Sequence, residues 1–146
     1  MKYIKLIFLL LIMSSYSENS VAQDFSTHKW ENRLVLILTD NTDNEKYLNQ
    51  VQELKNEPDG IKERKIVVYH ITPEKFKTGL SNEKWQKSET EYRRYKKTDS
   101  QPEIILLGLD GGVKLRAEEF LSTQKLFETI DAMPMRMQEM RRNKNK

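Results

Sequence analysis

Hydrophobic residues in the first half of the chain form two short runs separated by a helical pattern. The runs Arg33 to Thr39 (RLVLILT) and Lys65 to Ile71 (KIVVYHI) are almost continuously apolar and rich in β-branched residues, which is typical of strands buried on both faces. A helix is predicted between these two runs, and Pro58 and Gly60 are expected to end it. Strand, helix and strand with short links predict a right-handed crossover and parallel strands, with the first strand central. The apolar positions at helical spacing are Tyr47, Leu48, Val51 and Leu54.

A β-hairpin is predicted further along the chain. Glu103 to Gly108 is a third apolar run, and Val113 to Arg116 alternates as a half-buried strand does. Between them, Asp110-Gly111-Gly112 provides glycines that can adopt positive φ in a tight turn.

Two more helices are predicted around this hairpin. Aromatic residues recur at helical spacing from Asn82 to Lys97, a segment whose outer face is basic. Ser122 is a suitable cap for a last helix that Pro134 ends. The methionine-rich and basic residues 136–146 are expected to form a flexible tail. The apolar face of the last helix comprises Leu126, Phe127, Ile130 and Met133.

The first residues have the three-part layout of a secretory signal. Lys2 and Lys5 accompany an apolar run from Ile4 to Met13, and Ser20-Val21-Ala22 supplies small residues for cleavage. A membrane anchor is the alternative, but spanning a bilayer takes about twenty apolar residues, roughly twice this run. We therefore expect residues 1–22 to be a signal peptide. The product would be secreted or periplasmic, without a membrane span, and its domain would occupy residues 23–135.

Cysteine content and charge narrow the possible functions. The chain has no cysteine, so disulfides and thiol chemistry are excluded. The net charge is +3, to which residues 1–22 contribute +1, residues 23–135 contribute −2 and residues 136–146 contribute +4. A nucleic-acid-binding domain needs a basic face on the folded body, so we expect no nucleic-acid partner.

The order of predicted elements is β-α-β, then α, then β-β-α, with Pro102 just before the third strand. This order resembles the thioredoxin-like fold over residues 31–133. The resemblance implies an α/β fold with a mixed four-stranded sheet and helices on both faces. It also implies that Pro102 is a cis-proline facing the start of the first helix, where that fold carries its redox cysteines. That position reads Asp40, Asn41, Thr42 and Asp43 in this chain.

Three longer segments are similar to a narrower family. RLVLIL on the first strand, PEIILLGLDGGVKLR on the hairpin and IDAMPMRMQEM near the end resemble the domain of unknown function 4174 family. That family is described as thioredoxin-like or peroxiredoxin-like and occurs alone in bacterial exported proteins. It also occurs in vertebrate sushi-repeat-containing and coiled-coil-domain matrix proteins linked to adhesion. The resemblance leaves the bacterial function unassigned.

The acidic turn before the first helix is a candidate site with two interpretations. Asp40, Asp43 and Glu45 could bind calcium or magnesium together with Asn and Thr oxygens. However, Glu45 stands where an EF-hand loop needs glycine, and helix capping accounts for acids and amides at a helix start. We favour capping and predict no metal or cofactor. The candidate ligand cleft comprises Asp40, Asn41, Thr42, Asp43, Gln101 and Pro102.

Histidine chemistry has little support in the sequence. His28 and His70 are the only histidines, and neither has a nearby metal-ligand partner or a local signature of a nucleophile. A triad assembled in space stays open, because triads are recognised by geometry rather than by sequence position. A structural role is the expectation for both.

A partner surface is predicted from basic and methionine-rich segments. Basic residues with interleaved tyrosines suit an anionic glycan, although a solvated helix face is the commoner explanation of such a segment. The methionines after residue 132 suit either an adaptable partner surface or a cover for the core. The candidate residues are Arg93, Arg94, Lys96, Lys97, Met135 and Arg136.

These observations favour an exported, monomeric, redox-inactive thioredoxin-like binding module with a protein or anionic-glycan partner. The alternative is an enzyme of non-thiol chemistry that uses Asp40 and Asp43 at the position of the lost redox motif. A structural module of the cell envelope is a third possibility.

Overall fold

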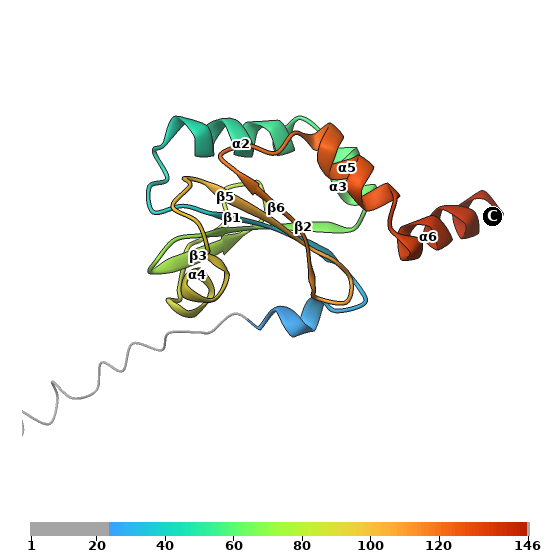
Figure 1. The fold of residues 1–146 in the computed structure, drawn as a ribbon, viewed down its shortest axis with the longest axis horizontal. Helices are drawn as coiled ribbons and strands as arrows, with labels where there is room; N and C mark the ends of the chain where they lie inside the picture. The colour runs from blue at the N-terminus through green and yellow to red at the C-terminus, as the bar shows by residue number, and fades with distance from the viewer. Residues whose placement is uncertain (1–23, 146) are drawn as a thin grey trace, which may run out of the picture.

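The computed structural model describes residues 24–145, so the predicted signal peptide lies outside the described residues. One mixed sheet runs through the domain in the strand order β4-β3-β2-β1-β5-β6. Helices cover both of its faces, with α2, α3 and α5 on one side and α4 on the other (Figure 1). The strands are β1 (Arg33–Leu38), β2 (Ile66–Ile71), β3 (Lys75–Thr78), β4 (Gln86–Lys87), β5 (Glu103–Leu107) and β6 (Val113–Glu118). The helices are η1 (Phe25–His28), α2 (Glu45–Lys55), α3 (Pro58–Glu63), α4 (Thr90–Tyr95), α5 (Thr123–Asp131) and α6 (Pro134–Lys144).

Strand β1 is central, as its apolar pattern predicted. It pairs in parallel with β2 and antiparallel with β5, and all six of its residues are buried. Alternate side chains point to opposite faces, so Val35 and Ile37 belong to the core under α2 and α5. Leu34, Leu36 and Leu38 belong to a second core under η1 and α4. Complete burial of β1 follows from having both faces covered.

The sheet has six strands rather than the predicted four. The region from Asn82 to Lys97, predicted as one helix, contains β4 and only a short α4, and β3 precedes it. Trp85 packs against the Lys75 and Lys77 ammonium groups on β3, at 4.9 and 5.2 Å from its ring centre. The aromatic residue that suggested a helical face therefore covers an edge strand instead.

Helix boundaries near α2 and α3 also differ from the prediction. The Asn44 side chain accepts a hydrogen bond from the Lys46 amide at 2.8 Å, which makes Asn44 the cap of α2. Pro58 begins α3 rather than ending a helix, because the first position of a helix needs no free N–H. Gly60 lets α3 approach α5 closely, since a Cβ there would lie 2.5 Å from the Phe127 ring.

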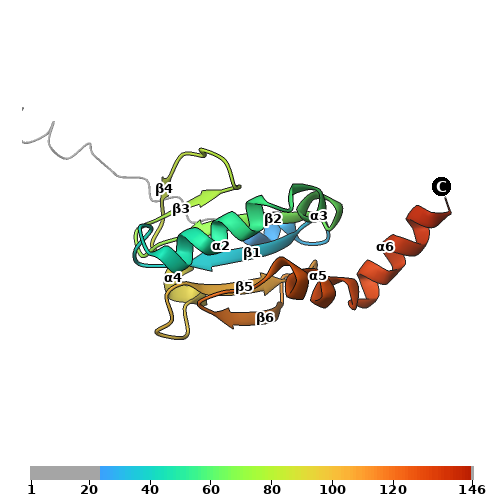
Figure 2. The same cartoon turned by 90° about the horizontal axis from the view of Figure 1, so that it is seen from above.

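The C-terminal residues, predicted as a flexible tail from residue 136, form helix α6 up to Lys144. Figures 1 and 2 show α6 extending away from the sheet, with the C-terminus at its far end. Arg136 at its start is only 1% exposed. Its guanidinium donates to Asp131 at 3.0 Å and to the carboxylate of Glu63, and Glu139 lies 3.5 Å away. This buried arginine attaches the helix to the domain.

The Arg136 ion pairs belong to a larger cluster at this end of the sheet. Arg33, also 1% exposed, donates to both oxygens of Glu139 at 3.3 Å. Arg64 donates to both oxygens of Asp131. Burial raises the pKa of Asp131, but the bonds from Arg64 and Arg136 outweigh this effect and hold that pKa below its usual value.

Within the part of the chain that the structure describes, none of the helices has both the length and the apolar character needed to cross a membrane.

Replacing Arg136 is expected to destabilise the domain strongly. Arg136→Met removes the buried guanidinium that joins Asp131 and Glu63, and losing these charge-assisted hydrogen bonds costs about 1.5 to 3 kcal/mol of unfolding free energy, because both carboxylates remain partly open to solvent. Urea denaturation measures this loss, and hydrogen exchange should show faster amide exchange along α6. Arg142→Met on the exposed side of the same helix is the matched control, expected to change stability by less than about 0.5 kcal/mol. Equal effects of the two variants would contradict the anchoring role.

A buried histidine makes stability depend on pH. Burial is the main cause that lowers the pKa of His70 from 6.5 to about 4; the hydrogen bond to Gly79 opposes this shift, and the Lys77 and Lys55 ammonium groups add to it. The unfolded chain binds a proton at His70 more readily than the folded protein does. The contribution of His70 to the free energy of unfolding is therefore fully present above pH 6.5 and is lost as the pH falls toward 4. The loss should reach roughly 3 kcal/mol. Urea denaturation across this range should give a clearly shallower pH dependence for His70→Gln, and parallel curves would contradict the assignment.

Candidate functional site

The two predicted halves of the ligand cleft lie side by side. Because β1 and β5 are antiparallel, the end of β1 meets the start of β5, with Leu38 opposite Glu103. The Asp40 amide donates a hydrogen bond to the side-chain oxygen of Gln101 at 3.0 Å. The Gln101–Pro102 peptide bond is cis, which confirms the sequence prediction.

The segment from Asp40 to Asp43 is a turn stabilised by local hydrogen bonds rather than the start of a helix. The Thr39 hydroxyl accepts from the Asn41 amide at 3.2 Å and donates to the Asn41 carbonyl at 3.0 Å. The Asn41 side chain accepts from the Asp43 amide at 2.8 Å. Neither acid therefore caps α2, and among the described residues neither carboxylate forms an ion pair. Both face solvent with their charge uncompensated.

A hollow of about 320 Å³ opens beside this turn, and we call it the strand-end hollow. It lies between the loops that follow β1 and β2, and neither Gln101 nor Pro102 lines it. Pro102 is buried, so the expected cleft over the proline is displaced toward β2 and β3. The hollow contains two carboxylates, from Asp40 and Glu74, against one ammonium group. Its lining residues are Asp40, Asn41, Thr42, Thr72, Pro73, Glu74 and Lys75.

A buried carboxylate fixes the loop that carries Gln101. Glu103 is fully buried and accepts hydrogen bonds from the Lys97 and Thr98 amides at 3.0 and 3.1 Å. Arg116 also binds this carboxylate, and the Lys96 ammonium lies 3.4 Å from it. Burial raises the pKa of Glu103, but these donors lower it by more, so the group is held below its usual pKa. The loop before the cis-proline is therefore rigidly held.

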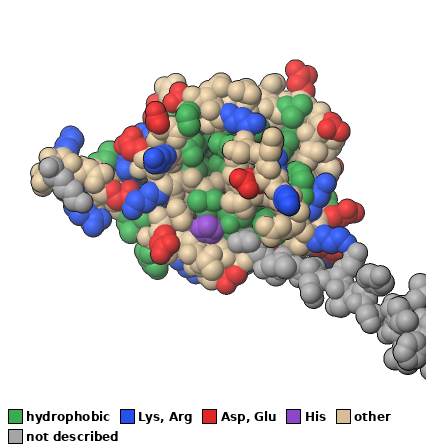
Figure 3. All heavy atoms as spheres, turned by 180° about the vertical axis from the view of Figure 1, so that it is seen from behind, with side chains coloured by type: hydrophobic (Ala, Val, Ile, Leu, Met, Phe, Trp, Pro, Cys, Tyr) green, Lys and Arg blue, Asp and Glu red, His purple; other side chains and the backbone are tan. Residues whose placement is uncertain are grey.

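The predicted partner residues do not form one surface. Arg136 is buried in ion pairs, and Lys96 donates to the carbonyls of Thr98 and Ser100 beside Glu103, so neither is available to a partner. Arg93, Arg94 and Lys97 are exposed near α4, whereas Met135 lies on α6 at the opposite end of the domain (Figure 1). On the face shown in Figure 3, basic and acidic side chains are interspersed.

The methionine series divides between the two interpretations. Met133 packs against the core under α5, as the covering role requires. Met135 and Met137 are 41% and 40% exposed on α6. These two are exposed enough to serve as an adaptable surface, and Met140 is half-buried.

Both histidines are held by hydrogen bonds on each ring nitrogen. The Nε2 of His70 faces the Gly79 carbonyl at 2.8 Å and therefore donates, so its Nδ1 accepts from the Tyr47 hydroxyl at 2.8 Å. Burial raises the pKa of Tyr47 to about 12, so this hydroxyl stays protonated. His70 is buried among these partners and supports the structure, in line with the sequence expectation.

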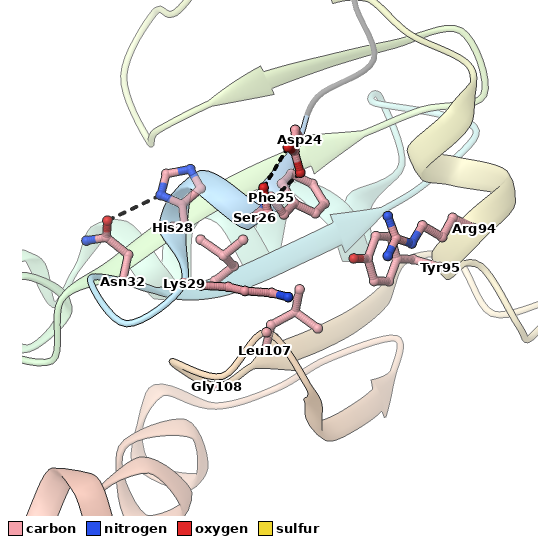
Figure 4. A pocket seen from close by; sticks show the side chains of 12 residues that line it. Asp24, Phe25, Ser26, His28, Lys29, Asn32, Arg94, Tyr95, Leu107 and Gly108 are labelled. Carbon is pink, nitrogen blue, oxygen red and sulfur yellow. Dashed lines mark hydrogen bonds between the residues drawn. The ribbon is translucent and has the colours of Figure 1, made fainter.

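A second pocket, of about 110 Å³, lies between η1 and α4, and we call it the η1–α4 pocket (Figure 4). The sequence analysis missed it because its walls come from segments more than sixty residues apart. The only local signal was the cluster of polar and aromatic residues after Asp24. The lining residues include Asp24, Phe25, His28, Lys29, Arg94 and Tyr95.

Among the described residues, no three histidine, cysteine or acidic side chains are grouped so that they could hold a metal ion. The acids of the strand-end hollow accordingly lack the ligand set that metal-assisted hydrolysis uses. Neither histidine lies in that hollow.

Comparison with solved structures supports the thioredoxin-like fold. The crystal structure of the reduced 2-Cys peroxiredoxin of Plasmodium vivax superposes with a TM-score of 0.55 at 14% sequence identity. The match covers 78% of this chain and 72% of the peroxiredoxin. At this identity the similarity shows the fold alone. A thiol peroxidase needs a cysteine, which this sequence lacks.

Sequence comparison identifies the family. No curated protein sequence matches the chain. The family model described as "Domain of unknown function (DUF4174)" matches residues 24–139, from η1 to the middle of α6. The chain therefore belongs to the DUF4174 family, as the three sequence segments had suggested.

Proposed function

We propose that this chain is an exported binding module on a thioredoxin-like scaffold, without thiol redox chemistry. The observation that carries the proposal is the turn Asp40–Asp43, which occupies the position of the redox motif and contains no cysteine. It is tied to Gln101 beside the cis peptide, next to an open hollow. The scaffold thus keeps a shaped recess where the chemistry of its fold is absent.

The charge of the strand-end hollow suggests its partner. Asp40 and Glu74 place two carboxylates on its wall, and Asp43 adds a third nearby. The one cation, Lys75, is directed to the Trp85 ring rather than to an acid. We therefore propose a protein segment that carries a lysine or arginine as the ligand of this hollow. Such exposed charge pairs contribute less than about 1 kcal/mol each, so binding should be weak and sensitive to salt.

The absence of redox chemistry is directly testable. Purified protein should reduce insulin disulfides and consume hydrogen peroxide at the rate of buffer alone, because there is no thiolate to react. A rate well above buffer in either assay would overturn the proposal.

Binding at the strand-end hollow is tested with peptides of opposite charge. A short lysine-rich peptide should shift the amide NMR signals of residues 40–42 and 72–75, whereas a glutamate-rich peptide of equal length should not. Asp40→Asn and Glu74→Gln should each lower the affinity for the lysine-rich peptide by about two- to fivefold, the range expected for loss of one exposed ion pair. Glu31→Gln, an exposed acid at the opposite end of β1, is the matched control and should leave affinity unchanged. Equal shifts with both peptides, or none, would refute this site.

Export is tested separately from binding. Expression of the full chain in a bacterial host should give a mature protein outside the cytoplasm whose N-terminal sequence begins at Gln23. Recovery of the uncut chain in the cytoplasm would contradict export without affecting the proposal for the hollow.

A further inference from the structure

We propose that the η1–α4 pocket binds one small oxyanion group, a carboxylate, sulfate or phosphate, through Lys29 and Arg94. This inference goes beyond the proposed function, since it concerns a different site and a ligand of opposite charge. The η1–α4 pocket has a volume of about 110 Å³, which is enough for several water molecules but far below the usual volume of a pocket that holds a whole organic ligand. The pocket therefore suits the charged group of a ligand whose remainder lies outside.

The cations of this pocket differ from their neighbours in making no close ion pair. Arg93, next in sequence to Arg94, is paired with Glu89 at 2.7 Å. Lys114, on the adjacent hairpin, is paired with Asp110 at 2.7 Å. Among the described residues, neither Lys29 nor Arg94 forms an ion pair. The two cations that line the pocket are thus available to an anion.

Asp24 is the one acid in the pocket lining, and its carboxylate is already engaged. One oxygen accepts from the Ser26 amide at 2.9 Å, and the other accepts from the Ser26 hydroxyl at 2.6 Å. The hydrogen bonds from Ser26 lower the pKa of Asp24, and the charges of Arg94 and Lys29 lower it further from a longer distance. The lysine, arginine and aspartate of the lining carry two positive charges against one negative charge. The surplus charge is therefore positive, opposite in sign to that of the strand-end hollow.

Both cations are positioned by the surrounding structure. Lys29 runs across the turn at Gly111, where φ is +78° and an added Cβ would lie 2.9 Å from the Lys29 Cε. The Arg94 guanidinium lies 5.3 Å from the centre of the Tyr95 ring. Figure 4 shows Lys29 extending through the pocket toward the side that carries Arg94 and Tyr95. Less side-chain entropy is lost on binding when the donors are already held in this way.

The remaining walls are rigid and offer no competing negative charge. Phe25 packs against Tyr69 and Tyr95, with ring centres 4.8 and 5.6 Å apart. His28 donates from Nδ1 to the Asn32 side-chain oxygen at 3.2 Å and accepts at Nε2 from the Tyr69 hydroxyl at 2.7 Å. The histidine is thereby held as part of the wall. An oxyanion would meet two exposed cations beside an aromatic wall, and both can donate charge-assisted hydrogen bonds to it.

The test uses three probes that separate the possible sources of the anion. Inorganic phosphate, a sulfated oligosaccharide and a uronate oligosaccharide are titrated into the full mature protein, and binding is followed by amide and side-chain NMR signals. At least one probe should shift the signals of Lys29, Arg94 and Gly111 and saturate. The probe that binds most tightly identifies the group as phosphate, sulfate or carboxylate.

Variants distinguish a built site from general attraction to basic residues. Lys29→Gln and Arg94→Gln should each weaken binding of the tightest probe by about two- to fivefold, the range expected for loss of one exposed charge. Arg93→Gln and Lys114→Gln are the matched controls and should change affinity by less than about twofold. All four positions are exposed, so the fold is expected to persist, and circular dichroism checks this. Saturating shifts at none of the three signals, or equal losses from Arg93→Gln and Arg94→Gln, would overturn the proposal.

Gly111→Ala provides an independent test that leaves both charges in place. The added Cβ must displace the Lys29 side chain, so affinity should fall while the net charge stays the same. Because positive φ also strains alanine, the thermal midpoint of each sample is measured alongside. Undiminished binding by a folded Gly111→Ala protein would contradict the role assigned to Lys29. None of these outcomes bears on the peptide experiment at the strand-end hollow.

Discussion

Burial of β1 on both faces is the constraint on which the other layers depend. Its even-numbered leucines pack toward η1 and α4, and its odd-numbered valine and isoleucine pack toward α2 and α5. A strand of this kind is stable only when helices cover both sides, because apolar surface left in water would cost about 25 cal/mol per Å². The same strand aligns β2 and β5 on its two edges. Both candidate sites lie where segments leave these three strands.

Buried ion pairs hold two parts of the fold that make few apolar contacts, helix α6 and the loop before the cis-proline. Helix α6 projects from the domain, and its attachment relies on Arg136 and the acids around it rather than on a large apolar contact (Figure 2). At the other end of β5, Glu103 gathers two backbone amides and two cations around one carboxylate. Such groups are costly to desolvate, and they are retained where each has several partners of opposite charge. The result is a rigid frame around the cis-proline.

The two candidate sites have opposite electrostatic character at separate places on one scaffold. The strand-end hollow carries surplus carboxylates close to the position of the missing redox motif. The η1–α4 pocket carries surplus cations on the other helical layer. A domain with two such recesses suits simultaneous contact with a basic protein segment and an anionic group.

The sequence by itself determined the central strands, the hairpin, the cis-proline and the lack of thiol chemistry. These features depend on local patterns: apolar runs, a glycine turn, a proline before a strand, and the absence of one residue type. The edge strands β3 and β4 depend on tertiary contacts, because Trp85 packs against the side chains of a neighbouring strand rather than on a helical face. It also decided that Arg136 is buried while Arg93 is exposed, although both sit in basic segments. The η1–α4 pocket exists only because segments 65 positions apart in the sequence, which carry Lys29 and Arg94, come to line the same recess. Partners that distant are set by packing, which local spacing does not encode.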